Sequence, residues 1–330
     1  MYIVTGGAGF IGSGVVHHLN RLGVDDILIV DHLDGGEKWK NLRGLRFADY
    51  LDRAQFLELA QACRDRFAAK AVIHLGACSA TTEFDAAYLM ENNTRYSQIV
   101  CRYCLANSVR CINASSAATY GDGALGFDDD PAGLDRLRPL NPYGYSKHLF
   151  DLWAAREGLL TRFASLKFFN VFGPNEYHKG DMKSVVCKAY EQIKATGTLR
   201  LFKSYRDGCP DGGQMRDFVY LKDCLEAISW LLEHPDANGL FNLGTGRARS
   251  FNDLARAVFA AMGAPYSVEY IDMPHAIRDK YQYFTQAKMD RLRASGYAAP
   301  FTPLEDAVAD YVKNYLAAPS PYLADGADGA

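Results

Sequence analysis

The stretch Thr5-Gly6-Gly7-Ala8-Gly9-Phe10-Ile11-Gly12 joins an apolar run at residues 2–5 to a helical pattern that begins near Phe10. Its glycines fit G-x-G-x-x-G when counted from Gly7 and G-x-x-G-x-x-G when counted from Gly6. Glycines permit a tight turn and close approach of the backbone to a pyrophosphate, and the helix N-terminus offers N–H groups and a partial positive charge to the anion. The stretch therefore predicts a dinucleotide cradle.

An acidic residue supports this interpretation. The next apolar run, residues 26–30, ends at Asp31, where a carboxylate can accept hydrogen bonds from the adenosine ribose. Asp31 favours NAD because it repels a 2′-phosphate, whereas Lys38 and Arg53 lie where they can hold one. The residues alone leave the choice between NAD and NADP open.

Short β-rich runs alternate with helical patterns in the first half of the chain, which is typical of a parallel sheet with helical crossovers. The runs are residues 2–5, 26–30, 46–49, 71–75, 110–114 and 164–169. We predict an α/β protein with a Rossmann-type doubly wound parallel sheet over residues 1–169. A second, smaller α/β substrate-binding domain is expected over residues 170–318, with room for some segments to return to the first domain.

The second half of the chain does not continue this regular alternation of β-rich runs and helical patterns. A polar, glycine-rich stretch at residues 204–213 predicts an exposed loop. Residues 319–330 are rich in Ala, Gly, Asp and Pro and predict a flexible tail. The remaining expected elements are helices at residues 221–234, 251–262 and 304–316 and a strand at residues 240–243.

The composition excludes several classes of protein. Hydrophobic residues make up 48% and charged residues 23% of the 330, so the chain is not mostly disordered. A net charge of −3 gives no reason to expect nucleic acid as a partner. No apolar run suggests a membrane span, and no leader precedes the first strand, so we expect a cytoplasmic protein. The eight cysteines are expected to be reduced, and Cys101 and Cys104 have no partners at metal-ligand spacing, so no metal site is expected.

Three residues further along form one candidate reaction centre. Ser116 follows the run at 110–114, at the sheet edge where ligands bind. Tyr143 and Lys147 are four residues apart and share a helix face, whereas Tyr145 does not share that face with Lys147. A tyrosine needs roughly 4 kcal/mol of preferential phenolate stabilisation to act as a base at neutral pH. Lys147 and a cationic nicotinamide can supply it, while Ser116 aligns a substrate hydroxyl.

With these residues the chain resembles the extended short-chain dehydrogenase/reductase family. Within it, six further motifs are similar to those of the ADP-L-glycero-D-manno-heptose 6-epimerases, and the likeness runs from Met1 to about Leu316. The motifs are Gly76-Ala77-Cys78-Ser79-Ala80-Thr81-Thr82-Glu83, Ala114-Ser115-Ser116-Ala117-Ala118-Thr119-Tyr120-Gly121, Phe169-Asn170-Val171-Phe172-Gly173-Pro174, His178-Lys179-Gly180, Arg216-Asp217-Phe218-Val219-Tyr220 and Phe241-Asn242-Leu243-Gly244-Thr245-Gly246.

The resemblance implies an isomerase of lipopolysaccharide core heptose biosynthesis that holds NADP tightly and inverts C6 of an ADP-heptose by transient oxidation. It also implies a homopentamer. Inversion requires a second acid/base group, because the hydride must return to the opposite face of the ketone. The resemblance assigns this role to Lys179 and a substrate contact to Asn170. The catalytic set is then Tyr143, Lys179, Lys147 and Ser116.

The same resemblance implies residues for both ligands. Those expected at the cofactor are Gly6, Gly9, Phe10, Ile11, Gly12, Asp31, His32, Lys38, Arg53, Leu75, Gly76, Ala77, Cys78, Ser79, Asn92, Tyr143 and Lys147. Those expected at the substrate are Ser116, Asn170, Val171, Asp181, Lys188, Leu201, Phe202, Lys203, Ser204, Arg216 and Tyr281. The chain departs from the family pattern at His32, Leu75, Asn175, Asp181 and Lys188.

Two other functions remain as alternatives. One is another sugar-nucleotide 4-epimerase or a dehydratase on the same scaffold. A dehydratase would need an Asp-Glu pair after Ser116, where this chain has Ala117-Ala118-Thr119. The other is a dinucleotide-binding protein without turnover, which would be free to lose Tyr143 or Lys147.

Overall fold

A computed structural model describes residues 1–278 and 281–325. Its largest feature is a seven-stranded parallel sheet with the strand order β10-β6-β5-β4-β1-β2-β3. The strands are β1 (Tyr2–Thr5), β2 (Ile27–Asp31), β3 (Asp49–Asp52), β4 (Ala71–His74), β5 (Arg110–Ser116), β6 (Ala164–Phe168) and β10 (Gly239–Leu243). This arrangement is the predicted doubly wound α/β sheet.

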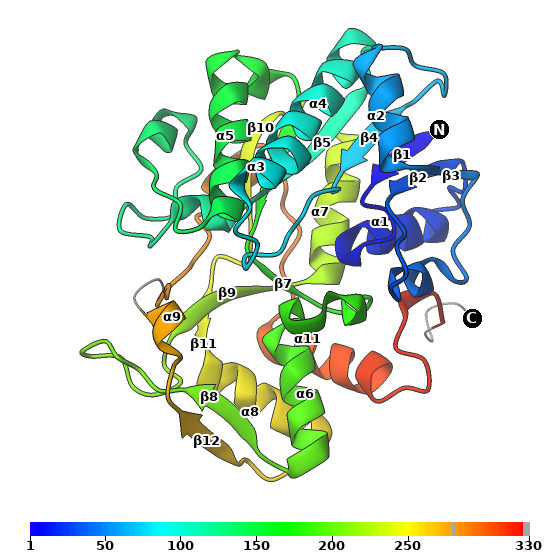
Figure 1. Ribbon diagram of the computed structural model, residues 1–330. Helices are drawn as coiled ribbons and strands as arrows, with labels where there is room; N and C mark the ends of the chain where they lie inside the picture. Colours follow the sequence, from blue (N-terminus) through cyan, green and yellow to red (C-terminus); the bar gives the residue numbers. More distant parts are fainter. Residues whose placement is uncertain (279–280, 326–330) are drawn as a thin grey trace.

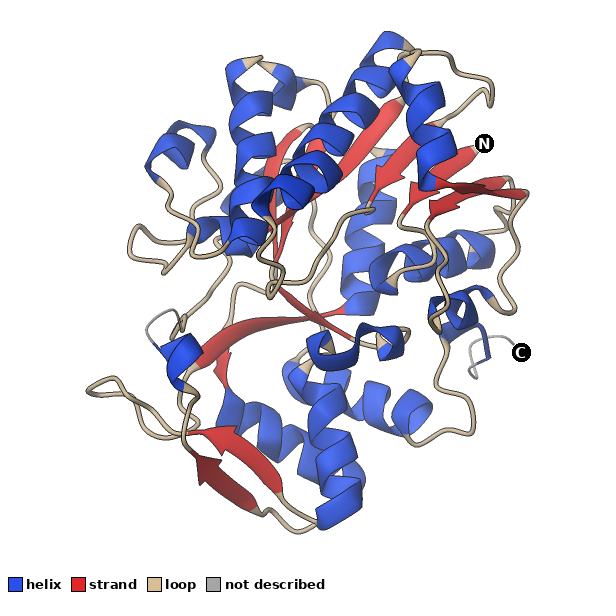
Figure 2. Ribbon diagram, viewed as in Figure 1, coloured by secondary structure: helices blue, strands red, loops and turns tan. Residues whose placement is uncertain are grey.

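Helices cover both faces of this sheet, as Figures 1 and 2 show. On one side α1 packs against α7, and on the other α2 packs against α4, next to α5. Both faces are therefore apolar, and every residue of β2, β4 and β6 is buried. The helices are α1 (Phe10–Arg21), α2 (Arg53–Gln61), α3 (Ala86–Leu89), α4 (Tyr96–Ala106), α5 (Pro142–Arg156) and α7 (Leu221–Glu233).

The rest of the chain forms a smaller α/β region below the large sheet in Figure 1. It contains a three-stranded sheet in the order β11-β9-β7 and a parallel pair, β12-β8. Its strands are β7 (Asn170–Phe172), β8 (Leu199–Phe202), β9 (Met215–Tyr220), β11 (Ala248–Ser250) and β12 (Val268–Ile271). Its helices are α6 (Val185–Thr196), α8 (Phe251–Met262), α9 (His275–Arg278) and α11 (Leu304–Tyr311), whereas α10 (Asp290–Ala294) returns to contact β10 of the large sheet.

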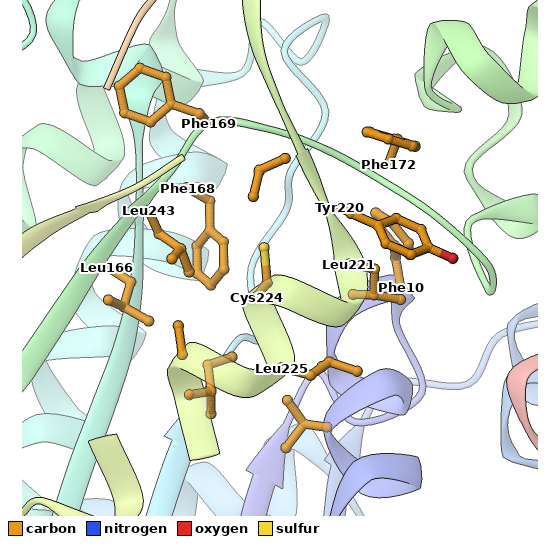
Figure 3. Close-up of a cluster of buried hydrophobic side chains, with 14 of the residues drawn as sticks. Phe10, Leu166, Phe168, Phe169, Phe172, Tyr220, Leu221, Cys224, Leu225 and Leu243 are labelled. Atoms are coloured by element: carbon orange, nitrogen blue, oxygen red, sulfur yellow. The ribbon is translucent and has the colours of Figure 1, made fainter. Parts of the chain in front are cut away.

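A continuous core joins the two regions. Figure 3 shows Phe10 beside Tyr220 and Leu221, with Cys224 and Leu225 further along α7. A side chain at Gly14 of α1 would come within 3.2 Å of Leu225 and 3.3 Å of Leu221, so this glycine lets the two helices approach closely. The loop that follows β1 is thereby fixed to the start of α7.

Most predicted elements are confirmed. The helices at 221–234 and 251–262 and the strand at 240–243 lie within a residue of their expected limits, and residues 204–213 form a largely exposed loop. The third strand is β3 (Asp49–Asp52) rather than residues 46–49, because Asp49, Tyr50, Leu51 and Asp52 pair with β2. The last helix is α-helical only to Tyr311 and continues as a π-helical turn, Val312–Leu316.

The C-terminal end differs from the predicted flexible tail. Tyr322 and Leu323 are buried, and the short helix η8 (Leu323–Asp325) lies against α1. The composition predicted fraying, but two apolar side chains are enough to dock the segment. The remainder of the predicted tail, residues 326–330, lies outside the described residues.

No helix in the described part of the chain is both long and apolar enough to cross a bilayer.

Candidate functional site

The register of the sheet brings three predicted site segments to one edge. Thr5 at the end of β1 pairs with His74 of β4, and His74 pairs with Asn113 of β5. The carboxyl ends of these strands therefore adjoin. The glycine loop, residues 75–79 and Ser116 leave the sheet next to one another, where open α/β sheets bind their ligands.

The glycine loop is shaped for close approach of a ligand. Gly6 has φ +67°, and a Cβ there would lie 2.8 Å from the backbone nitrogen of Gly76. A Cβ at Gly12 would lie 2.0 Å from the carbonyl oxygen of Gly6. Gly9 is the N-cap residue of α1 and has no side chain to cap the first turn, so Phe10 and Ile11 begin the helix with N–H groups directed outward. This loop fits the pyrophosphate of a dinucleotide.

Asp31 is buried and holds the glycine loop. Its carboxylate accepts hydrogen bonds from the backbone N–H of Ala8 at 2.8 Å and of His32 at 2.7 Å. It also pairs with the ammonium of Lys38, which lies on the 3-10 helix η1 (Lys38–Leu42). Lys38 thus neutralises the charge that would repel a 2′-phosphate.

The remaining cofactor candidates lie beside this pair. His32 Nδ1 is 3.0 Å from Asp52 Oδ2. Arg53, the first residue of α2, donates to Asn92 Oδ1. Lys38 and Arg53 are the two cations that the sequence offered for a phosphate. In the structure Lys38 pairs with Asp31, and Arg53 contacts Asn92.

Two buried residues that sequence reasoning missed support residues 75–79. His74 Nδ1 is 2.6 Å from Thr5 Oγ1, and its Nε2 is 2.8 Å from Ser97 Oγ. Asn93 accepts from the Cys78 N–H at 2.9 Å and donates to the Cys78 carbonyl at 3.0 Å. Burial and the charge of Lys147 lower the pKa of His74 to about 3, so its ring is neutral. The sequence feature that could have identified His74 is a histidine at the end of a buried apolar strand.

Ser116 and Tyr143 meet, and Lys147 lies one turn from Tyr143 on α5. Asn141 caps α5 by accepting the N–H of Gly144 at 2.8 Å, and the helix begins at Pro142. Tyr143 is hydrogen-bonded to Ser116, the last residue of β5. Lys147 donates to the carbonyl of Ala114 at 2.8 Å.

The pKa of Tyr143 departs from the sequence argument. Burial raises it above its ordinary value, and the hydrogen bond with Ser116 opposes this only in part. Burial also lowers the pKa of Lys147 to about 8, against the opposing charge of Asp151. Burial therefore disfavours the charged form of both groups in the free protein.

A buried ion pair lies beneath these residues. Lys167 and Asp151 are fully buried and 2.8 Å apart. Asp151 also accepts from Ser115 Oγ at 2.7 Å, and Lys167 donates to Thr119 Oγ1 at 2.6 Å. The pair thus fixes residues on both sides of Ser116. The sequence signal was a charged residue inside the apolar strand β6.

Lys179 reaches the glycine loop from a different direction. It lies in the 3-10 helix η6 (Tyr177–Met182), and its Nζ is 5.2 Å from the centre of the Phe10 ring. Burial lowers the pKa of Lys179, and the charge of Glu176 opposes this. Glu176 is fully buried and accepts from Ser184 Oγ at 2.7 Å and Tyr311 OH at 3.0 Å. Sequence reasoning missed Glu176.

The substrate candidates divide into three groups. Asn170 and Val171 begin β7, where Asn170 is exposed. Lys188 of α6 donates to the carbonyl of Asp181, so these two departures from the family pattern are in contact. The third group surrounds a cavity of about 700 Å³ among α6, β8, α8 and β12. Its lining includes the predicted residues Lys188, Leu201, Phe202 and Tyr281.

Arg216 packs against two aromatic residues that line this cavity. Its guanidinium carbon lies 5.1 Å from the centre of the Tyr281 ring and 5.6 Å from that of Phe251. Burial lowers the pKa of Arg216 below its ordinary value. Lys203 and Ser204 lie at the start of the exposed loop, where they bind Asp272 and Asp211. The lining of the cavity combines aromatic side chains with polar ones, and the guanidinium of Arg216 lies against two of those aromatic rings, a combination that suits a base and a diphosphate.

No cluster of three or more His, Cys, Asp or Glu suited to a metal ion is found among the described residues.

The doubly wound sheet, glycine loop and Ser-Tyr-Lys constellation define a dinucleotide-binding α/β protein. A model of the NAD dependent epimerase/dehydratase family matches residues 2–244, and the chain belongs to this family.

Curated relatives are similar over their whole length. A protein of Nitratidesulfovibrio vulgaris (strain DP4) named ADP-L-glycero-D-manno-heptose-6-epimerase is 59% identical over 323 residues, which is 98% of this chain and 100% of the relative. A protein of the same name from Fusobacterium nucleatum subsp. nucleatum is 47% identical over 332 residues, with 98% and 100% coverage.

Solved structures agree with this fold. The ADP-L-glycero-D-manno-heptose-6-epimerase of Helicobacter pylori has a TM-score of 0.77 at 25% identity and covers 94% of each chain. The UDP-glucose 4-epimerase of Thermus thermophilus, solved with NAD, has a TM-score of 0.70 at 25% identity and covers 93% of this chain and 96% of its own.

Proposed function

We propose that the chain interconverts ADP-D-glycero-β-D-manno-heptose and its L-glycero epimer at C6 by transient oxidation. The full-length likeness to relatives of that name supports this function. The observation that carries it is the presence of two separate acid/base candidates. Tyr143 stands at the sheet edge with Ser116, and Lys179 stands over Phe10. Inversion requires two such groups, whereas a simple dehydrogenation requires one.

In this mechanism Gly6, Gly9 and Gly12 would hold a nicotinamide dinucleotide, which would supply the hydride acceptor and donor for C6 and, when oxidised, a positive charge. Ser116 orients the C6 hydroxyl and Tyr143 takes its proton. Lys147, anchored on Ala114 and one turn from Tyr143 on α5, is the proposed source of positive charge beside it. After the ketone has turned, Lys179 donates a proton to the oxygen. The low pKa that burial gives Lys179 suits it to donate and to regain that proton.

The site is proposed to lie between the two domains divided near residue 169. The cavity among α6, β8, α8 and β12 would hold the nucleotide, with Arg216 near its diphosphate. This leaves the sugar between the β7 segment and Ser116. The other proposed substrate contacts are Asn170, Val171, Asp181, Lys188, Leu201, Phe202, Lys203, Ser204 and Tyr281.

NADP is the proposed cofactor. Asp31 would repel the 2′-phosphate, but Lys38 pairs with that carboxylate, and Arg53 offers a second cation nearby. Heat denaturation of the purified protein should release NADP, which chromatography separates from NAD. Release of NAD alone would contradict this choice.

The decisive measurement is incubation with ADP-D-glycero-D-manno-heptose, followed by NMR. We expect the L-glycero epimer to appear. Turnover of a UDP-sugar, but not of the ADP-heptose, would refute the proposed substrate.

We further propose a cytoplasmic homopentamer that serves lipopolysaccharide heptose synthesis. Sedimentation velocity of the purified chain tests the assembly, and a monomer or dimer would contradict it.

A further inference from the structure

The C-terminal segment, residues 319–325, is attached to the part of the chain that carries Lys179. Tyr177 donates from its hydroxyl to the carbonyl of Pro321 at 2.7 Å. The rings of Tyr177 and Tyr322 pack edge to face, with their centres 5.4 Å apart. Figure 1 shows this red segment returning from α11 to lie beside the blue α1, more than 300 residues away in sequence.

Asn175 links the C-terminal segment to the cofactor helix. Its side chain accepts the N–H of Leu323 at 3.0 Å and donates to Ser13 Oγ in α1 at 2.9 Å. Asn175 is 1% exposed and has φ +73°. Asparagine tolerates this left-handed conformation better than most residues. The left-handed backbone of Asn175 costs free energy, and it occurs at the position where the Asn175 side chain bonds to two distant segments.

Asn41 makes a second link, directly to the glycine loop. Its side-chain nitrogen lies 2.9 Å from the carbonyl oxygen of Ala8, 3.1 Å from that of Asn175 and 3.2 Å from His178 Nδ1. Asn41 is 2% exposed. Burial, together with the charges of Lys38 and Lys179, lowers the pKa of His178 to about 4, so its ring is neutral and free to accept. The residue before Lys179 is therefore tied to the loop that cradles the cofactor.

These contacts set the place of Lys179 relative to the reacting carbon. Acid/base groups lose efficiency steeply when displaced, and about 1 Å can cost a hundredfold in rate. We propose that residues 319–325, acting through Asn175, Asn41 and Tyr177, are a positioning element that holds Lys179 over the glycine loop. This inference rests on the proposed function for its effect on turnover, but the contacts themselves can be tested without substrate.

The first test compares two truncated chains. A chain ending at residue 318 lacks the whole segment, and a chain ending at residue 325 lacks only residues 326–330 and serves as the matched control. We expect the shorter chain to lose at least tenfold in kcat, with KM changed less than threefold and with its dinucleotide retained. Because Tyr143 and Lys147 are untouched, the first oxidation continues, so reduced dinucleotide should accumulate and absorb at 340 nm.

Hydrogen exchange of the same chains separates this inference from the proposed function. In the chain ending at residue 318, amides of residues 175–182 should exchange at least tenfold faster than in the control, with no comparable change in α5. If the parent fails to epimerise ADP-heptose but this exchange increases, only the proposed function is wrong. Unchanged exchange would overturn the inference, and so would parental kcat in the shorter chain.

A point substitution avoids the risk that truncation disturbs folding. Asn175→Gly keeps φ +73° available and removes both side-chain hydrogen bonds. Ser108→Gly is its control, because Ser108 is exposed and has φ +55°. We expect Asn175→Gly to lower kcat at least fivefold and to accumulate reduced dinucleotide, while Ser108→Gly does neither. Equal behaviour of the two variants would contradict the positioning role.

Discussion

The two acid/base candidates are built in different ways. Tyr143 and Lys147 lie one turn apart on α5, so helical spacing places them on one face, and Ser116 ends β5, a strand of the large sheet. Lys179 lies in a short irregular helix whose position depends on its buried N-cap residue Glu176 and on distant segments, including the side chain of Asn41 and the backbone N–H of Leu323. The first centre is therefore robust to changes elsewhere, whereas the second depends on the packing of the whole molecule.

The largest effect is expected at the first centre. Tyr143→Phe removes the proposed base but keeps the ring, so epimerisation should fall by roughly a hundred- to ten-thousandfold. The rate is measured by NMR with ADP-heptose, and no reduced dinucleotide should form. Tyr145→Phe is the matched control, because Tyr145 is exposed on the same helix. Similar rates for the two variants would show that the spacing argument chose the wrong residue.

A smaller effect is expected at the second centre. Lys179→Met should lower epimerisation by roughly a hundredfold, while the first oxidation proceeds and absorbance at 340 nm rises. Lys183→Met is the matched control, since Lys183 lies on the same segment but pairs with Glu191 at 2.6 Å. If Lys179→Met interconverts the heptoses as fast as the parent, the two-centre mechanism is wrong.

The smallest effect is expected at His74, which supports residues 75–79. His74 has a pKa of about 3 in the fold, against about 6.5 when unfolded. Below pH 6.5 the unfolded chain binds a proton that the fold excludes, so stability falls as pH falls toward 3. This contributes about 2 kcal/mol between pH 7 and pH 5.

His74→Asn removes this titration, so its unfolding free energy should change less over that interval. Urea unfolding of parent and variant at pH 7 and pH 5 measures the difference. Equal pH dependence in the two proteins would show that the pKa of His74 is not lowered in the fold.

Much of the fold could be predicted because its signals are local. Apolar runs, the glycine loop and Tyr143-x-x-x-Lys147 depend on residues within one or two turns of each other. Residues 46–49 were predicted as the third strand because they are as β-prone as the segment that follows, and only pairing with β2 selects Asp49–Asp52. The C-terminal end was predicted to fray because composition does not reveal a docking site on Tyr177 and Asn175.

The residues of the candidate site also separate into those that local signals predict and those that depend on distant segments. The role of Lys179 could be inferred only by resemblance, and the sequence carried no signal for Glu176 or Asn41, whose partners are far away along the chain. The activation of Tyr143 was also argued too simply. Pairing charges on a helix predicts a lowered pKa, but burial raises it, and burial is a property of the packed molecule.

The sequence by itself determined the sheet, the dinucleotide loop and the Tyr143–Lys147 pair, because hydrophobic periodicity, glycine and helical spacing act over short distances. The tertiary structure alone decided where Lys179 stands, that Lys38 pairs with Asp31, and how the C-terminal segment docks. Those outcomes depend on desolvation and on hydrogen bonds between segments that meet only after the chain has folded.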